Sequence, residues 1–425
     1  MQTITHTIFR HPIILVFLFS LLGACSSEEQ SQSAETATAT PSVPTTTLYA
    51  LEGARIISGD GSGPIESGTI VVDNGLIIGV GASGTVDVPA SAERVDVSGT
   101  TLMPMMVDTH VHLSTTREAL IQDLRNRVTF GVSAAMSLGM DGDDAILAMR
   151  EEEVPGVARF FSAGRGITRN EPGRTEVPHW VNTPAEARAA VQAEAARGVD
   201  IIKIWVDDRN GQYEKMTPEL YGAVIDEAHQ NGIRVTAHIF NLSDAKGLLE
   251  AGIDSFAHGV RDMDVDSEFV AMVQARPDTV LVPNMPYRGE PTDYSWLEGL
   301  VSADQLQQLQ SQEANPQAFE AWAIQARNLY KLNLAGVTIV LGTDGNTPYA
   351  AHVEIEDMVI AGMTTMQAIV AATSAGAEFL GMDDTGTLAA GMRADFIVLE
   401  ANPLEDITNT RMIRDVYLAG ERVER

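Results

Sequence analysis

The sequence contains a single cysteine, Cys25, and is poor in basic side chains. One cysteine cannot form an intramolecular disulfide, and zinc fingers and iron–sulfur clusters are excluded as well. Against 28 lysines and arginines stand 58 aspartates and glutamates, so the formal net charge at pH 7 is −30. Such a balance argues against nucleic acid or anionic lipid headgroups as partners. An acid-rich surface is commonly a trait of solubility or salt adaptation, so it indicates no catalytic activity by itself.

The composition is that of a globular protein with a large core. Of the 425 residues, 44% are hydrophobic and 20% are charged, which excludes a disordered or fibrous chain. At roughly 150 residues per domain, the length corresponds to two or three domains, although a single α/β barrel can take up about 250 residues.

The first residues have the features of a targeting segment. Arg10 precedes an apolar run over 13–22, which is too short to span a bilayer of ~30 Å as a helix but suits a secretory signal. The sequence Leu-Gly-Ala-Cys at 22–25 resembles a bacterial lipobox, in which the cysteine receives diacylglycerol and becomes the mature N-terminus. Ser26, in place of aspartate, resembles the outer-membrane sorting pattern. An ordinary signal peptide with an accidental cysteine is the alternative.

Residues 26–47 consist almost wholly of Ser, Thr, Glu, Gln, Ala and Pro, without apolar periodicity. Such a segment cannot bury enough surface to offset its ordering entropy, so we expect a flexible tether. The predicted organisation is a lipoprotein signal peptide over 1–24, followed by a lipid-anchored Cys25 and its tether over 25–47. The protein is then exported and anchored to the bacterial envelope, at the outer membrane facing the periplasm.

Both ends of the remaining chain have the pattern of short β-strands. Apolar runs at 69–72 and 76–80 flank Asp73-Asn74-Gly75, and Asn-Gly between apolar runs is a strong hairpin signal. Further short strands are expected at 86–88, 95–97, 395–399 and 415–418. We therefore expect a small composite β-sandwich built from residues 48–104 and 385–425.

The middle of the chain alternates strands and helices. Strands are expected at 102–111, 132–137, 157–163, 200–206, 234–238, 253–257, 279–282 and 337–341. Helices are expected between them, as at 184–197, 218–231, 242–251 and 317–335, and several end at glycine. Eight strands separated by helices predict an α/β fold, a parallel (β/α)8 TIM barrel over residues 105–384.

Six polar side chains fall at or near the carboxyl ends of these strands, the face on which barrel active sites are built. They are His110 and His112 on the first strand, Lys203 on the fourth, His238 on the fifth, His258 on the sixth and Asp344 on the eighth. His110 and His112 point to one face because they are two residues apart on a strand, and Asp108 shares that face. Four imidazoles, a carboxylate and a lysine suit two borderline divalent metals such as zinc.

A lone histidine at a strand end is more often a hydrogen-bonded core residue than a ligand, but four converging histidines favour ligation. Lys203 is more specific, since burial inside a barrel disfavours an unpaired ammonium and lowers the pKa of a lysine. The neutral amine can react with carbon dioxide, and the resulting carbamate would be an anionic bridge between two metals. The alternative is that Lys203 pairs with a buried carboxylate such as Asp108.

Taken together, these residues resemble the metal-dependent amidohydrolase superfamily. The resemblance rests on Asp108-Thr109-His110-Val111-His112, Lys203, His238, His258, Gly342-Thr343-Asp344, and the segment 386–395 where such chains return to the composite sandwich. It covers roughly residues 49–425 and is closest to the imidazolonepropionase-like and Xaa-Pro dipeptidase-like branch. It implies one metal on His110, His112 and Asp344, a second on His238 and His258, and a carboxylated Lys203 that bridges them.

The sequence departs from this family pattern at two places. Met105-Met106 replaces the usual pair of a glycine and an apolar residue before the first motif, which we interpret as a packing difference. The loop 205–209 lacks the Ser/Gly-rich segment common after the lysine in the dipeptidases, which puts a peptide substrate in doubt.

Such a site predicts hydrolysis of an amide bond in a dipeptide, an N-acyl amino acid or an aryl amide. A metal-bridging hydroxide would attack the carbonyl that one metal polarises. Asp344 would act as the general base and then as the general acid toward the leaving amine. The alternatives are an ester, lactone or phosphotriester hydrolase with the same site, and a non-catalytic binding lipoprotein. A mononuclear deaminase is disfavoured because Lys203 has no role there.

Substrate-binding groups are expected in the loops after the strands, namely Arg209, Tyr213, Arg261, Tyr287 and Arg288. The planar fork of an arginine suits a substrate carboxylate, and a tyrosine hydroxyl can stabilise an oxyanion. The alternative for each is an ordinary surface loop residue. We expect a small-molecule substrate and no nucleic acid partner, and a homo-oligomer is compatible with the sequence.

Overall fold

The computed structural model describes residues 46–425. The predicted signal peptide, Cys25 and all but the last two residues of the predicted tether lie outside the described residues. Within 46–425, no helix combines the length and the apolar character needed to cross a membrane. The domain boundaries given above remain a prediction.

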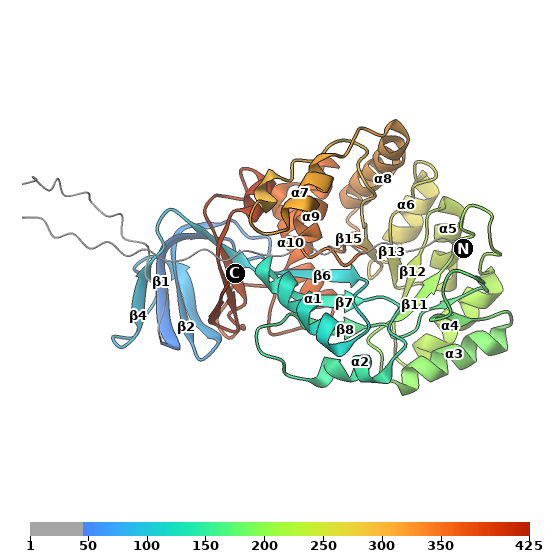
Figure 1. The fold of residues 1–425 in the computed structure, drawn as a ribbon, viewed down its shortest axis with the longest axis horizontal. Helices are drawn as coiled ribbons and strands as arrows, with labels where there is room; N and C mark the ends of the chain where they lie inside the picture. Colours follow the sequence, from blue (N-terminus) through green and yellow to red (C-terminus); the bar gives the residue numbers. More distant parts are fainter. Residues whose placement is uncertain (1–45) are drawn as a thin grey trace, which may run out of the picture. The chain divides into compact units, whose positions relative to one another are not determined.

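Strands from both ends of the described chain form one eight-stranded sheet (Figure 1). Its order is β18-β17-β16-β5-β1-β2-β3, and β4 pairs with β1. The strands are β1 (Leu48–Ile56), β2 (Ile65–Asp73), β3 (Leu76–Ala82), β4 (Glu93–Asp96), β5 (Thr101–Pro104), β16 (Phe396–Leu399), β17 (Ile413–Leu418) and β18 (Glu421–Val423). The antiparallel pairing of β5 with β16, in which Leu102 faces Val398, joins the two ends of the chain.

The hairpin between β2 and β3 turns at Asn74 and Gly75, whose φ angles are 48° and 83°. Two successive positive φ angles are what a tight two-residue hairpin requires, and Asn-Gly adopts them at the least cost. A Cβ on Gly75 would also lie 2.7 Å from the carbonyl oxygen of Ala419. Glycine therefore serves both the turn and its close contact with the segment before β18.

The first predicted barrel strand, 102–111, is wrong as a single element. It is divided at Met105 into β5, which belongs to the eight-stranded sheet, and β6 (Met106–Val111), which belongs to the barrel. Pro104 lacks an amide proton and so limits continuation of the ladder. Met105 instead donates its N–H to Asp395 (3.1 Å). Every residue from 101 to 111 is buried, so no change in burial marks the division between β5 and β6.

The barrel consists of two parallel sheets. One has the order β6-β7-β8, with β7 at Val132–Ser137 and β8 at Arg159–Ser162. The other has the order β10-β9-β11-β12-β13-β14-β15, with strands at Ile167–Thr168 (β9), His179–Trp180 (β10), Ile202–Trp205 (β11), Val235–His238 (β12), Ser255–Ala257 (β13), Val280–Val282 (β14) and Thr338–Ile339 (β15). The segment after β15 links the second sheet to β6, through contacts that include a bridge from Val111 to Gly345 and a bond from the Thr109 N–H to the Leu341 carbonyl (2.9 Å). This is the predicted (β/α)8 class of fold.

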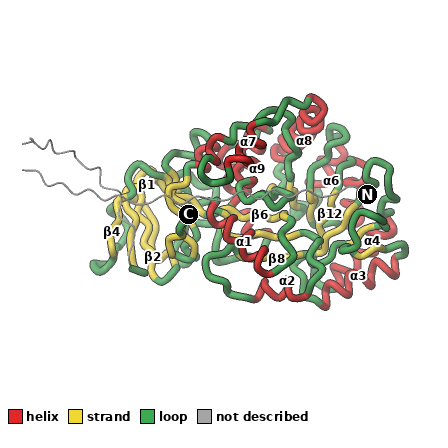
Figure 2. Tube along the Cα trace, viewed as in Figure 1, coloured by secondary structure: helices red, strands yellow, loops and turns green. Residues whose placement is uncertain are grey.

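Helices surround these strands, as Figure 2 shows. They are α1 (Arg117–Thr129), α2 (Asp144–Ala148), α3 (Pro184–Ala196), α4 (Pro218–Gln230), α5 (Leu242–Ala251), α6 (Ser267–Gln274), α7 (Ala303–Gln310), α8 (Pro316–Leu334), α9 (Ala350–Ile360), α10 (Thr365–Ala372) and α11 (Ser374–Phe379). Short 3-10 turns occur at Met149–Glu151, Ser295–Leu297 and Ile407–Arg411. The local sequence determines where some of these helices begin and end. Thr183 and Glu186 form a capping box at the start of α3, and Gly252, in a left-handed conformation, ends α5.

A buried ion pair fastens the first strand of the barrel to the segment after its last strand. Asp108 Oδ2 accepts hydrogen bonds from Arg127 Nη1 (3.0 Å) and from the Thr343 hydroxyl (2.8 Å). Asp108 Oδ1 accepts the Thr343 N–H (3.1 Å), and Arg127 Nη2 donates to the Gly345 carbonyl (2.9 Å). Both charged side chains are fully buried. His110 lies two residues after Asp108, and Asp344 lies between Thr343 and Gly345, so these bonds place His110 and Asp344 beside each other.

We expect Arg127→Leu to lower the free energy of unfolding by about 3–5 kcal/mol, because it leaves the Asp108 carboxylate buried without its cation. Chemical denaturation followed by circular dichroism measures the change. Arg125→Leu, at an exposed position of the same helix, is the matched control and should change the free energy by no more than about 0.5 kcal/mol. Equal effects of the two substitutions would contradict this role of the ion pair.

Candidate metal centre

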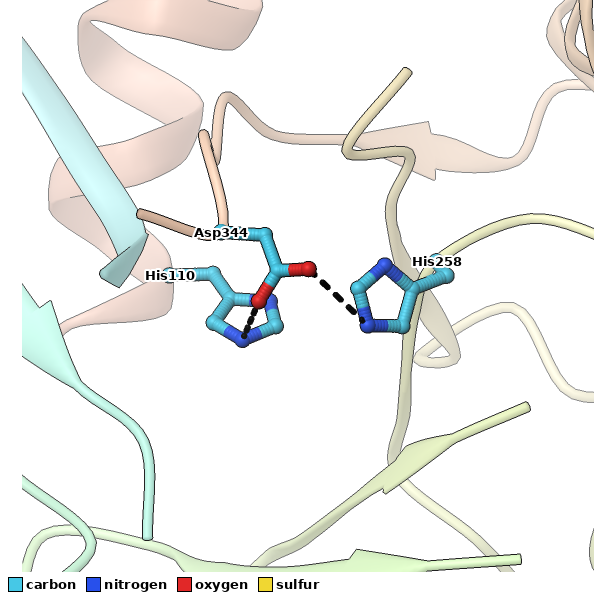
Figure 3. A group of neighbouring side chains, drawn as sticks. All are labelled: His110, His258 and Asp344. Carbon is cyan, nitrogen blue, oxygen red and sulfur yellow. Dashed lines mark ion pairs between the residues drawn. The ribbon is translucent and has the colours of Figure 1, made fainter. Parts of the chain in front are cut away.

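The structure brings several of the six predicted site residues together around the Asp344 carboxylate. Asp344 Oδ1 lies 3.1 Å from His110 Nε2 and 3.1 Å from His112 Nε2, and Oδ2 lies 3.6 Å from His258 Nε2. Donor atoms of His110, His258 and Asp344 all lie within 4.8 Å of one another. Figure 3 shows Asp344 between the two imidazoles. The arrangement has the residue types and the spacing of a metal site.

Two members of this group have strained backbone conformations. His258 and Asp344 have φ angles of 79° and 54°, in the left-handed region that costs a non-glycine residue energy. His258 directly follows β13, and Asp344 lies in the segment after β15, so the chain turns sharply where each side chain enters the site. Such strain is concentrated at functional positions in proteins.

Asn284 holds one imidazole in a defined tautomer. Its Oδ1 accepts the backbone N–H of His258 (3.2 Å), which fixes the orientation of the amide, and lies 2.8 Å from His110 Nδ1. Because a carbonyl oxygen only accepts, His110 must carry its proton on Nδ1. His110 Nε2 then presents a lone pair to the ionised Asp344 oxygen and has no hydrogen-bond partner in the described chain. A cation that binds both atoms would resolve this opposition.

The protonation states of three histidines and of Asp344 are those of metal ligands. Burial lowers the pKa of His110 to about 4 and that of His238 to about 3, and it lowers the pKa of His258 well below its usual value. Burial by itself raises the pKa of the Asp344 carboxyl, but the adjacent His110 and His258 hold it well below its usual range. Neutral imidazoles and an ionised carboxylate are the forms that ligate zinc.

Lys203 lies on β11 and is 1% exposed. Its Nζ has no hydrogen-bond partner among residues 46–425, and it lies 5.7 Å from the centre of the Trp205 ring. Burial and the charge of Arg209 lower the pKa of the Lys203 amine to about 7, against an opposing effect of Asp344. Asp108 is engaged by Arg127, so the alternative pairing of Lys203 with Asp108 is not found. A neutral amine is thus available near pH 7.

His238 is placed differently from the other three histidines. Its Nε2 lies 3.2 Å from Asp207 Oδ2 and 3.3 Å from Arg209 Nη1, and its ring centroid is 4.5 Å from that of His258. It therefore adjoins the group around Asp344 through His258. Asp207 and Asn284 were missed by the sequence analysis. The position of Asp207 two residues after a strand was a usable signal, whereas nothing in the sequence distinguished Asn284.

The predicted substrate residues have different surroundings. Arg209 pairs with Glu171 (3.0 Å) and Asp207 (2.7 Å), and Arg288 pairs with Asp357 (3.2 Å) and Glu356 (3.5 Å). The hydroxyls of Tyr213 and Tyr287 donate to the carbonyls of Pro172 and Glu313. Arg261 forms no ion pair within 4 Å in the described chain, and its Nε donates to Gln325 Oε1 (3.1 Å). Their contact with substrate remains a prediction.

Residues 101–423 match the model of the amidohydrolase family, and the chain belongs to that family. It is a hydrolase that acts on carbon–nitrogen bonds. A structure from Bifidobacterium longum described as a candidate prolidase is 28% identical, with a TM-score of 0.73 over 90% of this chain and 96% of that chain. Ochratoxinase of Aspergillus niger is 29% identical over 236 residues, which cover 52% of this chain and 45% of the relative. An uncharacterized protein of Mycobacterium tuberculosis is 27% identical over 67% of this chain and 75% of its own length.

We expect Asn284→Ala to weaken divalent metal binding about tenfold to a hundredfold, as loss of the partner that orients a ligating histidine commonly does. Asn284→Asp keeps the acceptor oxygen and should bind metal close to normally. Competition with a chromophoric chelator measures the affinity. In the metal-free protein, histidine-selective nitrogen-15 spectra should show His110 protonated at Nδ1, and Asn284→Ala should mix the tautomers. An unchanged affinity and tautomer in Asn284→Ala would refute the role.

Proposed function

We propose that the protein hydrolyses an amide bond in a small molecule, such as a dipeptide, an N-acyl amino acid or an aryl amide, at a centre of two divalent metal ions. The observation that carries the proposal is the opposition of two lone-pair atoms, His110 Nε2 and Asp344 Oδ1, at 3.1 Å. Such a contact is repulsive unless a cation lies between them or a proton is taken up, and burial disfavours the protonated imidazole.

The donor set fits two ions of the zinc type. His110, His112 and Asp344 would hold one, and His238 and His258 would hold the other. Lys203 is the residue that would join them as a carbamate: its neutral amine adds to carbon dioxide, a C–N bond forms, and one proton is released. Bound ions of this kind supply Lewis acidity toward a carbonyl and lower the pKa of water.

Asp344 is the group placed to move protons. Its side chain is 38% exposed, whereas His110 and Lys203 are almost fully buried, so water and substrate can reach its carboxylate. As an ionised base it would accept a proton from the attacking water, and as the resulting acid it would deliver that proton to the leaving amine. The candidate prolidase and the ochratoxinase among the similar proteins support an amide as the bond cleaved.

The location of the protein is also a proposal. The lipobox at 22–25 supports a lipid anchor on Cys25 and attachment to the bacterial envelope, at the outer membrane facing the periplasm. These residues lie outside the part of the chain that the structure describes.

The function is tested by assaying the metal-loaded protein against dipeptides, N-acyl amino acids and aryl amides, with release of the free amine as the readout. Removal of metal by a chelator should abolish the activity, and added zinc should restore it. Failure to cleave any member of the three classes, with metal bound at two ions per chain, would refute amide hydrolysis.

We expect Asp344→Asn to lower kcat by about 10²–10⁴-fold, because an amide is a very poor base. The variant should retain much of its metal, since the amide oxygen remains a ligand, and elemental analysis checks this. Asp278→Asn, at an exposed position before β14, is the control and should have normal kcat. A near-normal rate in Asp344→Asn would remove Asp344 from proton transfer.

We expect Lys203→Ala to reduce the metal content from close to two ions per chain to one or fewer, because the anionic bridge is lost. Short carboxylic acids such as acetate and propionate should partly restore metal and activity by filling the gap. In wild-type protein loaded under carbon-13 carbon dioxide, a carbamate resonance should appear and should be absent from Lys203→Ala. An unmodified amine in active, metal-loaded enzyme would exclude the bridge.

A further inference from the structure

One arginine near the candidate metal centre, Arg261, has a guanidinium group that forms no ion pair with a carboxylate in the described chain. Arg261 follows β13, three residues after His258. Unlike Arg209 and Arg288, each of which pairs with two carboxylates, it has no carboxylate within 4 Å among residues 46–425. Burial lowers the pKa of its guanidinium to about 10, while Asp344, Asp207 and Glu354 oppose this from longer range. The group therefore remains a cation at neutral pH.

The protein fixes one edge and one face of this guanidinium. Nε donates to Gln325 Oε1 (3.1 Å), and Gln325 is itself held by a bond from its Nε2 to the Pro283 carbonyl (2.6 Å). The guanidinium carbon lies 3.9 Å over the centre of the Phe240 ring, a stacking that suits arginine. The backbone N–H of Arg261 also donates to the Phe240 carbonyl (2.9 Å).

The other edge is available. Neither terminal nitrogen of Arg261 has a hydrogen-bond partner in residues 46–425, and neither belongs to the fully buried unpaired atoms. The N–H donors on this edge form a rigid fork that matches a carboxylate in two parallel hydrogen bonds. Since Gln325 and Phe240 already hold the side chain, little conformational freedom remains to be lost on binding.

Phe240 contacts both the Arg261 guanidinium and two histidines of the candidate metal centre. Its ring centroid lies 4.5 Å from that of His238 and 5.4 Å from that of His258, so the same ring contacts both histidines and the guanidinium. A substrate whose scissile carbonyl lies at those histidines can extend along Phe240 toward Arg261.

We propose that Arg261 binds a carboxylate of the substrate, so that the enzyme selects amides bearing a free acid, such as N-acyl amino acids and dipeptides, over neutral aryl amides. This inference rests on the proposed amide hydrolysis and narrows its substrate class. Arg209, which is neutralised by Glu171 and Asp207, is assigned to holding the loop after β11 and not to carboxylate recognition.

The test uses matched pairs of N-benzoyl amino acids and dipeptides, each as the free acid and as the primary amide. Wild-type protein should cleave the acids with a kcat/KM at least tenfold higher. Arg261→Met, which keeps an apolar stem on Phe240, should lose about tenfold to a hundredfold on the acids and less than threefold on the amides. Arg261→Lys should recover part of the loss. Arg327→Met, on exposed α8 surface, is the control.

Equal activity of wild type on acids and amides, or equal losses on both in Arg261→Met, would overturn the inference while leaving amide hydrolysis intact. If neither form is cleaved, and aryl amides are not cleaved either, amide hydrolysis fails, and calorimetry of N-benzoylglycine against its primary amide decides the inference separately. Tighter binding of the acid that disappears in Arg261→Met supports the carboxylate site, and equal binding of the two overturns it.

Discussion

The ion pair between Asp108 and Arg127 is the interaction on which the site depends, because it is where the barrel comes together. Bringing both charges into the interior costs several kcal/mol per ion, and the cost is offset only by complete hydrogen bonding. Asp108 meets this condition with Arg127, the Thr343 hydroxyl and two backbone N–H groups. The two bonds from Thr343 tie β6 to the segment after β15, and the bond from Arg127 to the Gly345 carbonyl ties α1 to the same segment, so the two parts of the candidate site that are farthest apart in the chain are held together.

Burial then sets the chemistry of the groups that this junction positions. The same loss of hydration that makes a charged imidazole costly keeps His110, His238 and His258 neutral and brings the pKa of Lys203 to about 7. Asp344 differs because it is partly exposed and surrounded by imidazoles, so it stays ionised. Burial therefore accounts for the neutral histidines and for the lowered pKa of Lys203, whereas the neighbouring imidazoles account for the ionised Asp344.

The fold class and the group of polar strand ends could be predicted from sequence because both depend on local patterns. Parallel strands bring their carboxyl ends to one face, and the two-residue spacing of His110 and His112 fixes their common side. The division at Met105 could not be predicted, since residues 101–111 are buried on either sheet and only pairing partners distinguish them. Asn284 and Gln325 act through partners on other strands, which no spacing along the chain reveals. In the same way, the sequence did not distinguish Arg209 from Arg261, because one of the two carboxylates that neutralise Arg209, Glu171, is distant in the chain.

An acid substrate raises a question of charge, since the chain carries a formal net charge of −30. Salt screens exposed charges beyond about 8 Å at physiological ionic strength, so the general surface neither attracts nor strongly repels a small anion at that distance. Recognition must then come from a short-range contact in which water is displaced and the geometry is fixed. Arg261 meets this requirement, because Gln325 and Phe240 hold its guanidinium while its outer edge stays open. The proposed selectivity for an acid therefore depends on one oriented cation in an acidic protein, and not on the net charge of the chain.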